Sequence, residues 1–186
     1  DDIYALMTAR PARAAPGREK PAIGLAERLP NVSNNQMAGL LESLVSPAYE
    51  GRADLPVIAG ALQMEIDELF PIAEVLQMLG FAELEQGDIR LTAAGRLFAE
   101  SDTETRKRLF AEHLLKFVPL AAHIRRVLDE RPGHRAPRIR FEPELEDHLT
   151  EGAAEETLKA VIRWGRYAEL FSYDDQAELF SLENPA

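Results

Sequence analysis

The same four-residue phrase stands twice in this chain, each time after an apolar helical pattern and before a second apolar run. It is Phe81-Ala82-Glu83-Leu84 first and Tyr167-Ala168-Glu169-Leu170 86 residues later. One supersecondary unit written twice would explain this, and a duplicated unit restricts the folds open to the chain. Chance is the competing explanation, because Ala-Glu-Leu occurs a third time at residues 177–179. The matching order of the surrounding elements favours duplication.

In the first copy, apolar residues recur at spacings of three and four from Ile66 through Phe70 to Leu79, which indicates one buried face of a helix. Gly80 is expected to end that helix, because glycine is favoured just after a helical C-terminus. Pro71 is tolerable if Asp67 is the N-cap, since first-turn amides lack helical partners.

The residues around this helix predict the rest of the unit. Alternating apolar residues on both sides of the turn at 85–88 indicate a short β-hairpin over 81–91. Upstream, capping residues predict helices over 36–46 and 57–62. Arg52-Ala53, between these two helices, is the predicted first strand.

Similar parts precede the second phrase. A long helical pattern covers residues 106–128, and Pro119 should kink or divide it near Phe117 because proline lacks an amide proton. Arg138-Ile139 lies 86 residues after Arg52-Ala53 and is predicted to be the equivalent strand. A short helix is expected over 141–149.

The second phrase itself follows a helix whose apolar face includes Leu158, Val161 and Trp164, with Gly165 as the expected stop. Trp164 lies at a core position of this pattern and is interpreted as packing. The returning strand is predicted at 179–182, so the second hairpin has the longer loop.

A helix, a short strand, two helices and a hairpin are typical of a winged helix. We therefore predict a mainly α protein with small β-hairpins (α+β), built from tandem winged-helix units. The first unit spans 31–100 and the second 101–186. Residues 1–10 form a short amphipathic piece, and the Pro- and Gly-containing stretch up to residue 30 is typical of a linker.

The composition limits the class of protein. The chain has no cysteine, which excludes disulfide scaffolds and thiolate metal sites and is compatible with a reducing compartment. No apolar run approaches the roughly 20 residues of a membrane span, and the N-terminus lacks the order of a signal peptide. We expect a cytoplasmic protein.

The charge is unevenly distributed. The net charge is −11, yet ten Lys or Arg face only three Asp or Glu between Arg106 and Arg140. These cations are either solvated and paired with acidic neighbours or form a docking surface for an anion or an acidic protein. The candidate residues for such a surface are Arg106, Lys107, Arg108, Arg125, Arg126, Arg135, Arg138 and Arg140.

Motifs for catalysis are missing from the sequence. It contains no Gly-rich phosphate loop ending in Gly-Lys-Ser or Gly-Lys-Thr, no G-x-G-x-x-G turn and no G-x-S-x-G elbow. His148 with Glu144 and Asp147 is the nearest approach to a metal-ligand cluster, and such residues are ordinary on an exposed helix. We predict no catalytic, cofactor-binding or metal-binding residue here.

Nucleic-acid binding is the sharpest rival function, because a winged helix can place its recognition helix in the major groove. The candidate helix of the first unit, within residues 65–79, carries acidic residues and no Lys or Arg. Phosphates would meet like charge there, which disfavours DNA. The candidate recognition helix of the second unit has Lys159, Arg163 and Arg166, but also Glu155 and Glu156.

Several segments together resemble the C-terminal AAA-associated domain of ABC transporter ATP-binding proteins, and the resemblance covers most of residues 31–183. The segments that carry it are 32–42 (VSNNQMAGLLE), 51–56 (GRADLP), 79–83 (LGFAE), 87–92 (GDIRLT), 106–111 (RKRLFA), 119–121 (PLA), 123–128 (HIRRVL) and 164–171 (WGRYAELF).

This resemblance implies a place behind the ATPase core of subunits similar to those of nitrate, sulfonate, taurine and bicarbonate importers. Residues 2–8 would then be the last helix of that core. Walker A, signature and Walker B motifs are absent from these residues. ATP and magnesium would therefore belong to the core of the parent chain, and this chain is expected to be no enzyme.

Three functions follow as hypotheses. The first is a regulatory accessory domain, peripheral to the inner membrane, that contacts the ATPase core, its twin subunit or the membrane subunits, or pairs as a homodimer. The second is a winged-helix transcription regulator. The third is a sensor that holds a small anion at the arginines between Arg125 and Arg140.

Overall fold

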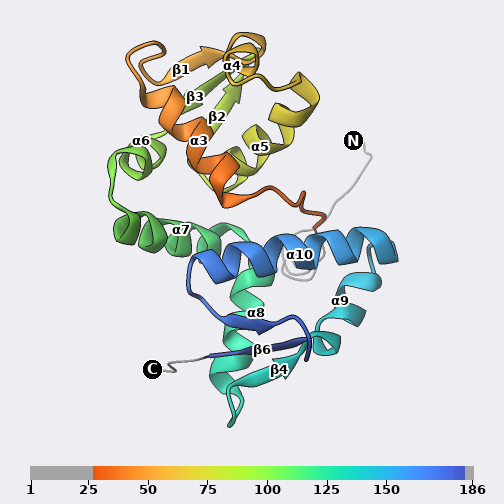
Figure 1. Ribbon diagram of the computed structural model, residues 1–186. Helices are drawn as coiled ribbons and strands as arrows, with labels where there is room; N and C mark the ends of the chain where they lie inside the picture. The colour runs from red at the N-terminus through yellow and green to blue at the C-terminus, as the bar shows by residue number, and fades with distance from the viewer. Residues whose placement is uncertain (1–26, 183–186) are drawn as a thin grey trace, which may run out of the picture.

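The protein, described here from a computed structural model over residues 27–182, is mainly helical with two small antiparallel sheets (Figure 1). The predicted α+β class is confirmed at this level. Predictions for residues 1–26 lie outside the described residues. The elements are α3 (Asn34–Val45), β1 (Arg52–Asp54), α4 (Leu55–Ala61), α5 (Ile66–Met78), β2 (Ala82–Glu85), β3 (Asp88–Leu91), α6 (Ala93–Glu100), α7 (Thr103–Phe117), α8 (Pro119–Glu130), β4 (Arg135–Pro137), the 3-10 turn η1 (Arg138–Arg140), α9 (Glu142–Glu146), α10 (Glu151–Tyr167), β5 (Ser172–Asp174) and β6 (Leu179–Ser181).

Local capping chemistry sets where the first helices begin. The Ser33 hydroxyl accepts a hydrogen bond from the Gln36 amide, and the Gln36 side chain accepts one from the Ser33 amide, which closes a capping box on α3. Asp54 caps α4 in the same way through the Val57 amide. Both helices therefore begin close to their predicted positions.

The first sheet has the strand order β1-β3-β2, with both pairs antiparallel. The hairpin between β2 and β3 turns through Gln86 and Gly87, which both have positive φ, as a two-residue hairpin turn requires. The predicted hairpin is thus confirmed. On its exposed face, Arg52 pairs with Asp88 and Arg90 pairs with Glu83.

The second sheet has the matching order β4-β6-β5. The elements of this second half follow one another as α8, β4, α9, α10 and the β5–β6 hairpin, which is the same order as α3, β1, α4, α5 and the β2–β3 hairpin. The duplicated order of elements is therefore present in the fold. The helices α6 and α7 connect the two sets (Figure 1).

The repeated phrase, however, is not structurally equivalent in the two copies. Residues 82–84 lie in strand β2, whereas Tyr167 is the last residue of α10 and Ala168 is its C-cap. Gly80 and Glu169 are the residues that take positive φ directly after their helices. The predicted offset of 86 is wrong for this part of the fold, and the strand expected at the second phrase begins only at Ser172.

Gly165 does not end the second helix, contrary to the prediction. It is buried within α10, and a Cβ built on it would lie 2.1 Å from Cζ of Phe171. The helix ends two residues later, where the Leu170 amide donates to the Gly165 carbonyl and the Glu169 amide to that of Arg166. Glycine is needed here for the close approach of the Phe171 ring and not for the turn.

Helix α5 begins at a different cap from the predicted one. Glu65 is the N-cap, and its amide donates to the Glu68 carboxylate at 2.9 Å. Asp67 lies in the first turn, where a carboxylate complements the positive helix terminus. Pro71 is therefore inside the helix rather than in the first turn. Gly80 ends the helix as predicted, with φ +82°.

The strand that corresponds to β1 in the second half lies three residues before its predicted position. Strand β4 comprises Arg135–Pro137, and Arg138 begins the 3-10 turn instead. Alanine supplies the buried residue of both short strands, Ala53 in β1 and Ala136 in β4. The proline at 119 divides the long helical pattern at Val118, as expected.

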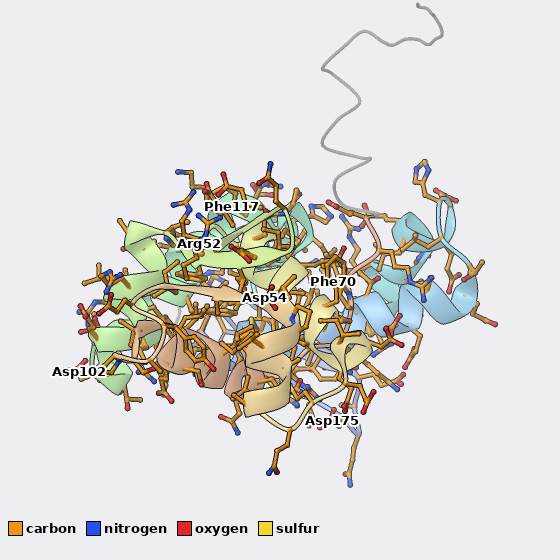
Figure 2. The ribbon with its side chains drawn as sticks, turned by 90° about the horizontal axis from the view of Figure 1, so that it is seen from above. Arg52, Asp54, Phe70, Asp102, Phe117 and Asp175 are labelled. Atoms are coloured by element: carbon orange, nitrogen blue, oxygen red, sulfur yellow. The ribbon has the colours of Figure 1, made fainter. Side chains whose placement is uncertain are left out.

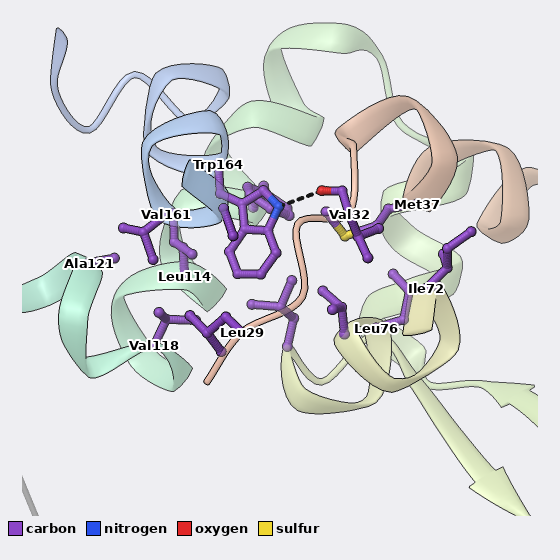
Figure 3. Packing of buried hydrophobic residues seen from close by; sticks show 14 of the residues in the cluster. Leu29, Val32, Met37, Ile72, Leu76, Leu114, Val118, Ala121, Val161 and Trp164 are labelled. Atoms are coloured by element: carbon purple, nitrogen blue, oxygen red, sulfur yellow. Dashed lines mark hydrogen bonds between the residues drawn. The ribbon is translucent and has the colours of Figure 1, made fainter. Parts of the chain in front are cut away.

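A single hydrophobic cluster runs through both halves of the described chain. Trp164 on α10 is fully buried in it, and its Nε1 donates to the Val32 carbonyl at 2.8 Å (Figure 3). Leu29 and Val32, which precede α3, lie between Trp164 and the α5 side chains Ile72 and Leu76. Leu29 and Val32 therefore belong to the core, and the predicted packing role of Trp164 is confirmed.

Candidate interaction surfaces

The predicted basic residues are spread over α7, α8, β4 and η1. Arg106 is the first of them, and it joins helices within the protein. Its guanidinium donates to the backbone carbonyls of Phe98 and Ala99 and to the Glu42 carboxylate at 2.8 Å. These bonds tie α7 to the end of α6 and to α3, so Arg106 supports the fold.

Lys107 and Arg125 also have partners from distant parts of the chain. Lys107 Nζ contacts the Glu169 carboxylate at 3.0 Å, and this hydrogen bond raises the pKa of the lysine. Arg125 donates to the Leu170 carbonyl at 2.8 Å and pairs with Asp129 on its own helix. Both side chains connect α7 and α8 to the turn that follows α10.

Arg138 is the most deeply placed of the predicted residues, with 7% of its surface exposed. Its guanidinium contacts Glu142, Glu155 and the Tyr173 hydroxyl. Burial acts to lower the pKa of Arg138, but the hydrogen bonds to Tyr173 and Glu142 and the charge of Glu155 outweigh it, so the pKa lies above its ordinary value. The cation is fixed by these partners.

The other four predicted residues lie nearer the solvent. Arg140 pairs with Glu144 at 3.3 Å, and Arg108 donates to the Thr105 hydroxyl. Arg126 and Arg135 are exposed, and within residues 27–182 their side chains have no hydrogen-bond or ion-pair partner. Most of the predicted basic surface is therefore neutralised by the protein itself.

A groove with a volume of about 650 Å³ lies between α8, the end of α10 and the strand β5. Arg125 and Arg166 line it, but each is engaged: Arg166 donates to the Tyr173 carbonyl and pairs with Asp175. Glu169 adds a carboxylate to the lining. The groove therefore offers an anion little uncompensated positive charge.

Glu144, one of the three residues that come nearest to a metal-ligand cluster in the sequence, is engaged by other side chains. Glu144 accepts from His123 Nε2 at 3.1 Å and pairs with Arg140. His113 is instead packed against the Phe81 ring and bonded to the Leu79 carbonyl. Across the described part of the chain, no group of three or more His, Cys, Asp or Glu residues could hold a metal ion.

The α4–α5 corner has an unusual solvent-exposed face. Ile66 and Phe70 were predicted to be buried, but they are 41% and 42% exposed. They lie one turn apart on α5, on a stripe that flanks the buried face formed by Leu69 and Leu76. The outer face of the adjacent α4 consists entirely of uncharged residues: Pro56, Val57, Gly60 and Ala61. We call the exposed face of these two helices the α4–α5 corner.

Carboxylates lie on α5 and at the N-caps of both helices of this corner. From residue 53 to residue 89 the chain has eight Asp or Glu and no Lys, Arg or His. Asp54 and Phe70 are seen together on the α4–α5 side in Figure 2. None of the corner carboxylates takes part in an ion pair within residues 27–182; they are Asp54, Glu65, Asp67, Glu68 and Glu74.

The acidity of the corner was visible in the sequence, but its apolar face was not. Ile66 and Phe70 fit the helical period that also includes Leu69 and Leu76, so a pattern of spacings alone assigns them to one face. The position around the helix distinguishes Ile66 and Phe70 from the core residues. Residues 66, 70, 74 and 77 form one stripe, in which the last two residues are the polar Glu74 and Gln77.

These observations define a helical domain with two small antiparallel sheets. The chain belongs to the C-terminal AAA-associated domain family, which it matches over residues 56–174. This identifies it as an accessory domain of AAA or ABC proteins. No curated protein matches the sequence, and no solved structure does.

Within residues 27–182, no helix combines the length and the apolar content that crossing a bilayer would need.

Proposed function

We propose that the chain is a non-catalytic, regulatory domain behind the ATPase core of an ABC importer subunit, of the nitrate, sulfonate, taurine or bicarbonate type. It acts through protein–protein contacts at the cytoplasmic side of the membrane complex. Membership of the C-terminal AAA-associated domain family carries this proposal. ATP and magnesium would be bound by the core of the parent chain.

We further propose that the two sets of elements are tandem winged helices, divided near residue 100. Each set has a helix, a short strand, two helices and a hairpin, with the first strand paired to the last. In this assignment α4–α5 and α9–α10 are the two helix-turn-helix pairs. The surface that reads DNA in other winged helices is then acidic and apolar in the first unit, which favours a protein ligand.

The two rival functions have less support from the side chains. On α10, Lys159 pairs with Glu155, and Arg166 is engaged by Asp175, so few cations are left for phosphates. For the anion sensor, Arg138 is enclosed by Glu142, Glu155 and Tyr173. The side chains therefore favour the accessory domain over both the transcription regulator and the anion sensor.

Deletion of residues 31–186 from the parent subunit tests the proposal. Substrate-stimulated ATPase activity, uptake and assembly would be measured in the reconstituted transporter. We expect assembly of the ATPase core to persist while the stimulation of ATPase by substrate changes. If activity, its regulation and assembly all equal those of the intact transporter, the regulatory role is refuted.

A further inference from the structure

We propose that the α4–α5 corner is the docking surface of this domain, and that it takes a partner protein surface in which apolar side chains are flanked by Lys or Arg. The inference rests on the proposed accessory function, because it names the place and the chemistry of the contact. It begins with exposure: Val57, Ile66 and Phe70 are 59%, 41% and 42% exposed on adjacent helices. Apolar groups gathered on one face are characteristic of interaction sites.

The apolar residues define what kind of contact fits. Phe70 provides an aromatic side chain, the residue class that anchors protein interfaces. Around it, α4 exposes only small or apolar groups from Pro56 to Ala61, so a partner can approach the helix without displacing charged side chains. The centre of the corner is thus apolar, as the core of a protein interface is.

The charges around this centre select the partner. Five carboxylates without ion-pair partners in the described chain lie on α5 or at the N-caps of α4 and α5, at residues 54, 65, 67, 68 and 74. Some also cap helices: Asp54 accepts from the Val57 amide, and Glu68 from the Glu65 amide. Lys and Arg of a partner would complement this potential, whereas nucleic acid and anionic lipid would be repelled.

A photo-cross-linking residue in place of Phe70 tests the proposal in the assembled transporter. p-Benzoylphenylalanine would replace Phe70 in the parent subunit, and the cross-linked partner peptide would be sequenced. We expect a peptide in which apolar residues have Lys or Arg within a few positions. The control carries the same group at Leu97, which is 51% exposed but lies on α6, and it should give about tenfold less product with that peptide.

The charge requirement is tested separately. In Asp67→Lys/Glu74→Lys the apolar centre remains while most of the negative charge of the corner is removed, so the cross-linking yield from position 70 should fall about tenfold, and salt at about 1 M should lower the wild-type yield similarly. Circular dichroism and Tm would check that each variant is folded. A cross-linked peptide without Lys or Arg, a product with lipid or nucleic acid, or equal yields from positions 70 and 97 would overturn the proposal.

The failures of the two proposals are distinguishable. If deletion of residues 31–186 alters regulation but Phe70→Glu does not, and position 70 gives no cross-link, the accessory function stands and the docking surface lies elsewhere. If the deletion has no effect, the proposed regulatory function itself is refuted. The matched variant Leu97→Glu should behave as wild type in both assays.

Discussion

At the residue scale, Gly165 and Gly152 show that two glycines on one helix have opposite roles. Gly165 is buried on α10, and its missing Cβ makes room for the Phe171 ring; nothing lies within 4 Å of a Cβ built on Gly152. A helical Gly→Ala change ordinarily stabilises by about 1 kcal/mol. The environment of each glycine therefore decides the sign of the effect.

We expect Gly165→Ala to destabilise the protein by about 1–3 kcal/mol, because the added methyl group must displace the Phe171 ring in a packed core. Gly152→Ala on the same helix is the control and should be neutral or stabilising by up to about 1 kcal/mol. Urea denaturation measures both. Equal effects of the two substitutions would contradict this account of Gly165.

Trp164 carries a second residue-scale prediction. Trp164→Phe removes the Nε1 donor and leaves the buried Val32 carbonyl without its partner, which should cost about 1–3 kcal/mol, with a further loss from the smaller ring. The midpoint of urea unfolding is the measurement. Leu97→Ala, at an exposed position, should change stability by no more than about 0.5 kcal/mol.

At the scale of elements, Arg138 joins four of them. It begins η1 after β4 and contacts Glu142 on α9, Glu155 on α10 and Tyr173 on β5. Arg138→Ala should destabilise by about 1.5–3 kcal/mol, the range for hydrogen bonds to charged groups. The loss should stay below that of a fully buried pair, because Glu142 and Glu155 are partly exposed.

Arg138→Lys separates charge from geometry in this network. A single ammonium group cannot reproduce the planar fork that reaches three acceptors, so lysine should recover only part of the stability. Thermal unfolding of the wild type and the two variants provides the comparison. Full recovery by lysine would mean that charge alone holds these elements together.

The N-terminus of α7 predicts a dependence on pH. The Thr105 amide donates to the Asp102 carboxylate, and this hydrogen bond lowers the pKa of Asp102. A depressed pKa in the folded state gives stability that is complete above the unfolded pKa and is lost as pH falls through the folded value. Asp102→Asn keeps a capping oxygen without the titration.

We therefore expect the Tm of the wild type to fall more steeply below about pH 4 than that of Asp102→Asn, with the two curves parallel from pH 5 to pH 7. Differential scanning calorimetry across this range is the measurement. Parallel curves at all pH values would show that the cap does not depend on the charge of Asp102.

At the scale of the whole molecule, the segment before α3 connects the two halves. Leu29 and Val32 are each 4% exposed, and the Leu29 amide donates to the Thr157 hydroxyl of α10 at 3.1 Å. Because one hydrophobic cluster includes residues near both sheets, we expect a single cooperative unfolding transition.

A chain that begins at Ser33 should lose much of this stability. Removing Leu29 and Val32 forfeits about 1.5–3 kcal/mol of burial for each side chain, against a total of about 5–15 kcal/mol for a typical domain. A chain that begins at Glu27 is the control, and urea unfolding is the measurement. Two separate transitions in the control would show that the halves fold independently.

The sequence predicted elements well where the local signal was strong. Ser33 and Asp54 cap the two helices that were expected from capping residues, and Pro119 divides the long helix. These features depend on a few neighbouring residues. It failed at Gly165 and at the second phrase, because glycine and Ala-Glu-Leu are compatible with both a helix and a strand end. At Gly165 a packing contact with the Phe171 ring, six residues further along the chain, is what requires glycine.

For the candidate surfaces, too, some features can be predicted from the sequence and others depend on tertiary contacts. Net charge and the missing cations from 53 to 89 can be counted in the sequence. Whether a basic residue is free depends on which carboxylates reach it, as the pairing of Lys107 with Glu169 illustrates. Helical spacing alone likewise could not predict that Ile66 and Phe70 are exposed to solvent, because the packing of α5 decides which of its faces meets the core.

By itself, the sequence determined the helical elements, the duplicated order of parts, the family and the uneven charge, since these depend on nearby residues and on composition. The tertiary structure decided which glycine ends a helix, which cations are neutralised and which apolar side chains face the solvent. Those outcomes depend on contacts such as Trp164 with Val32, between residues far apart in the chain. Such contacts stabilise the protein only once the core has assembled.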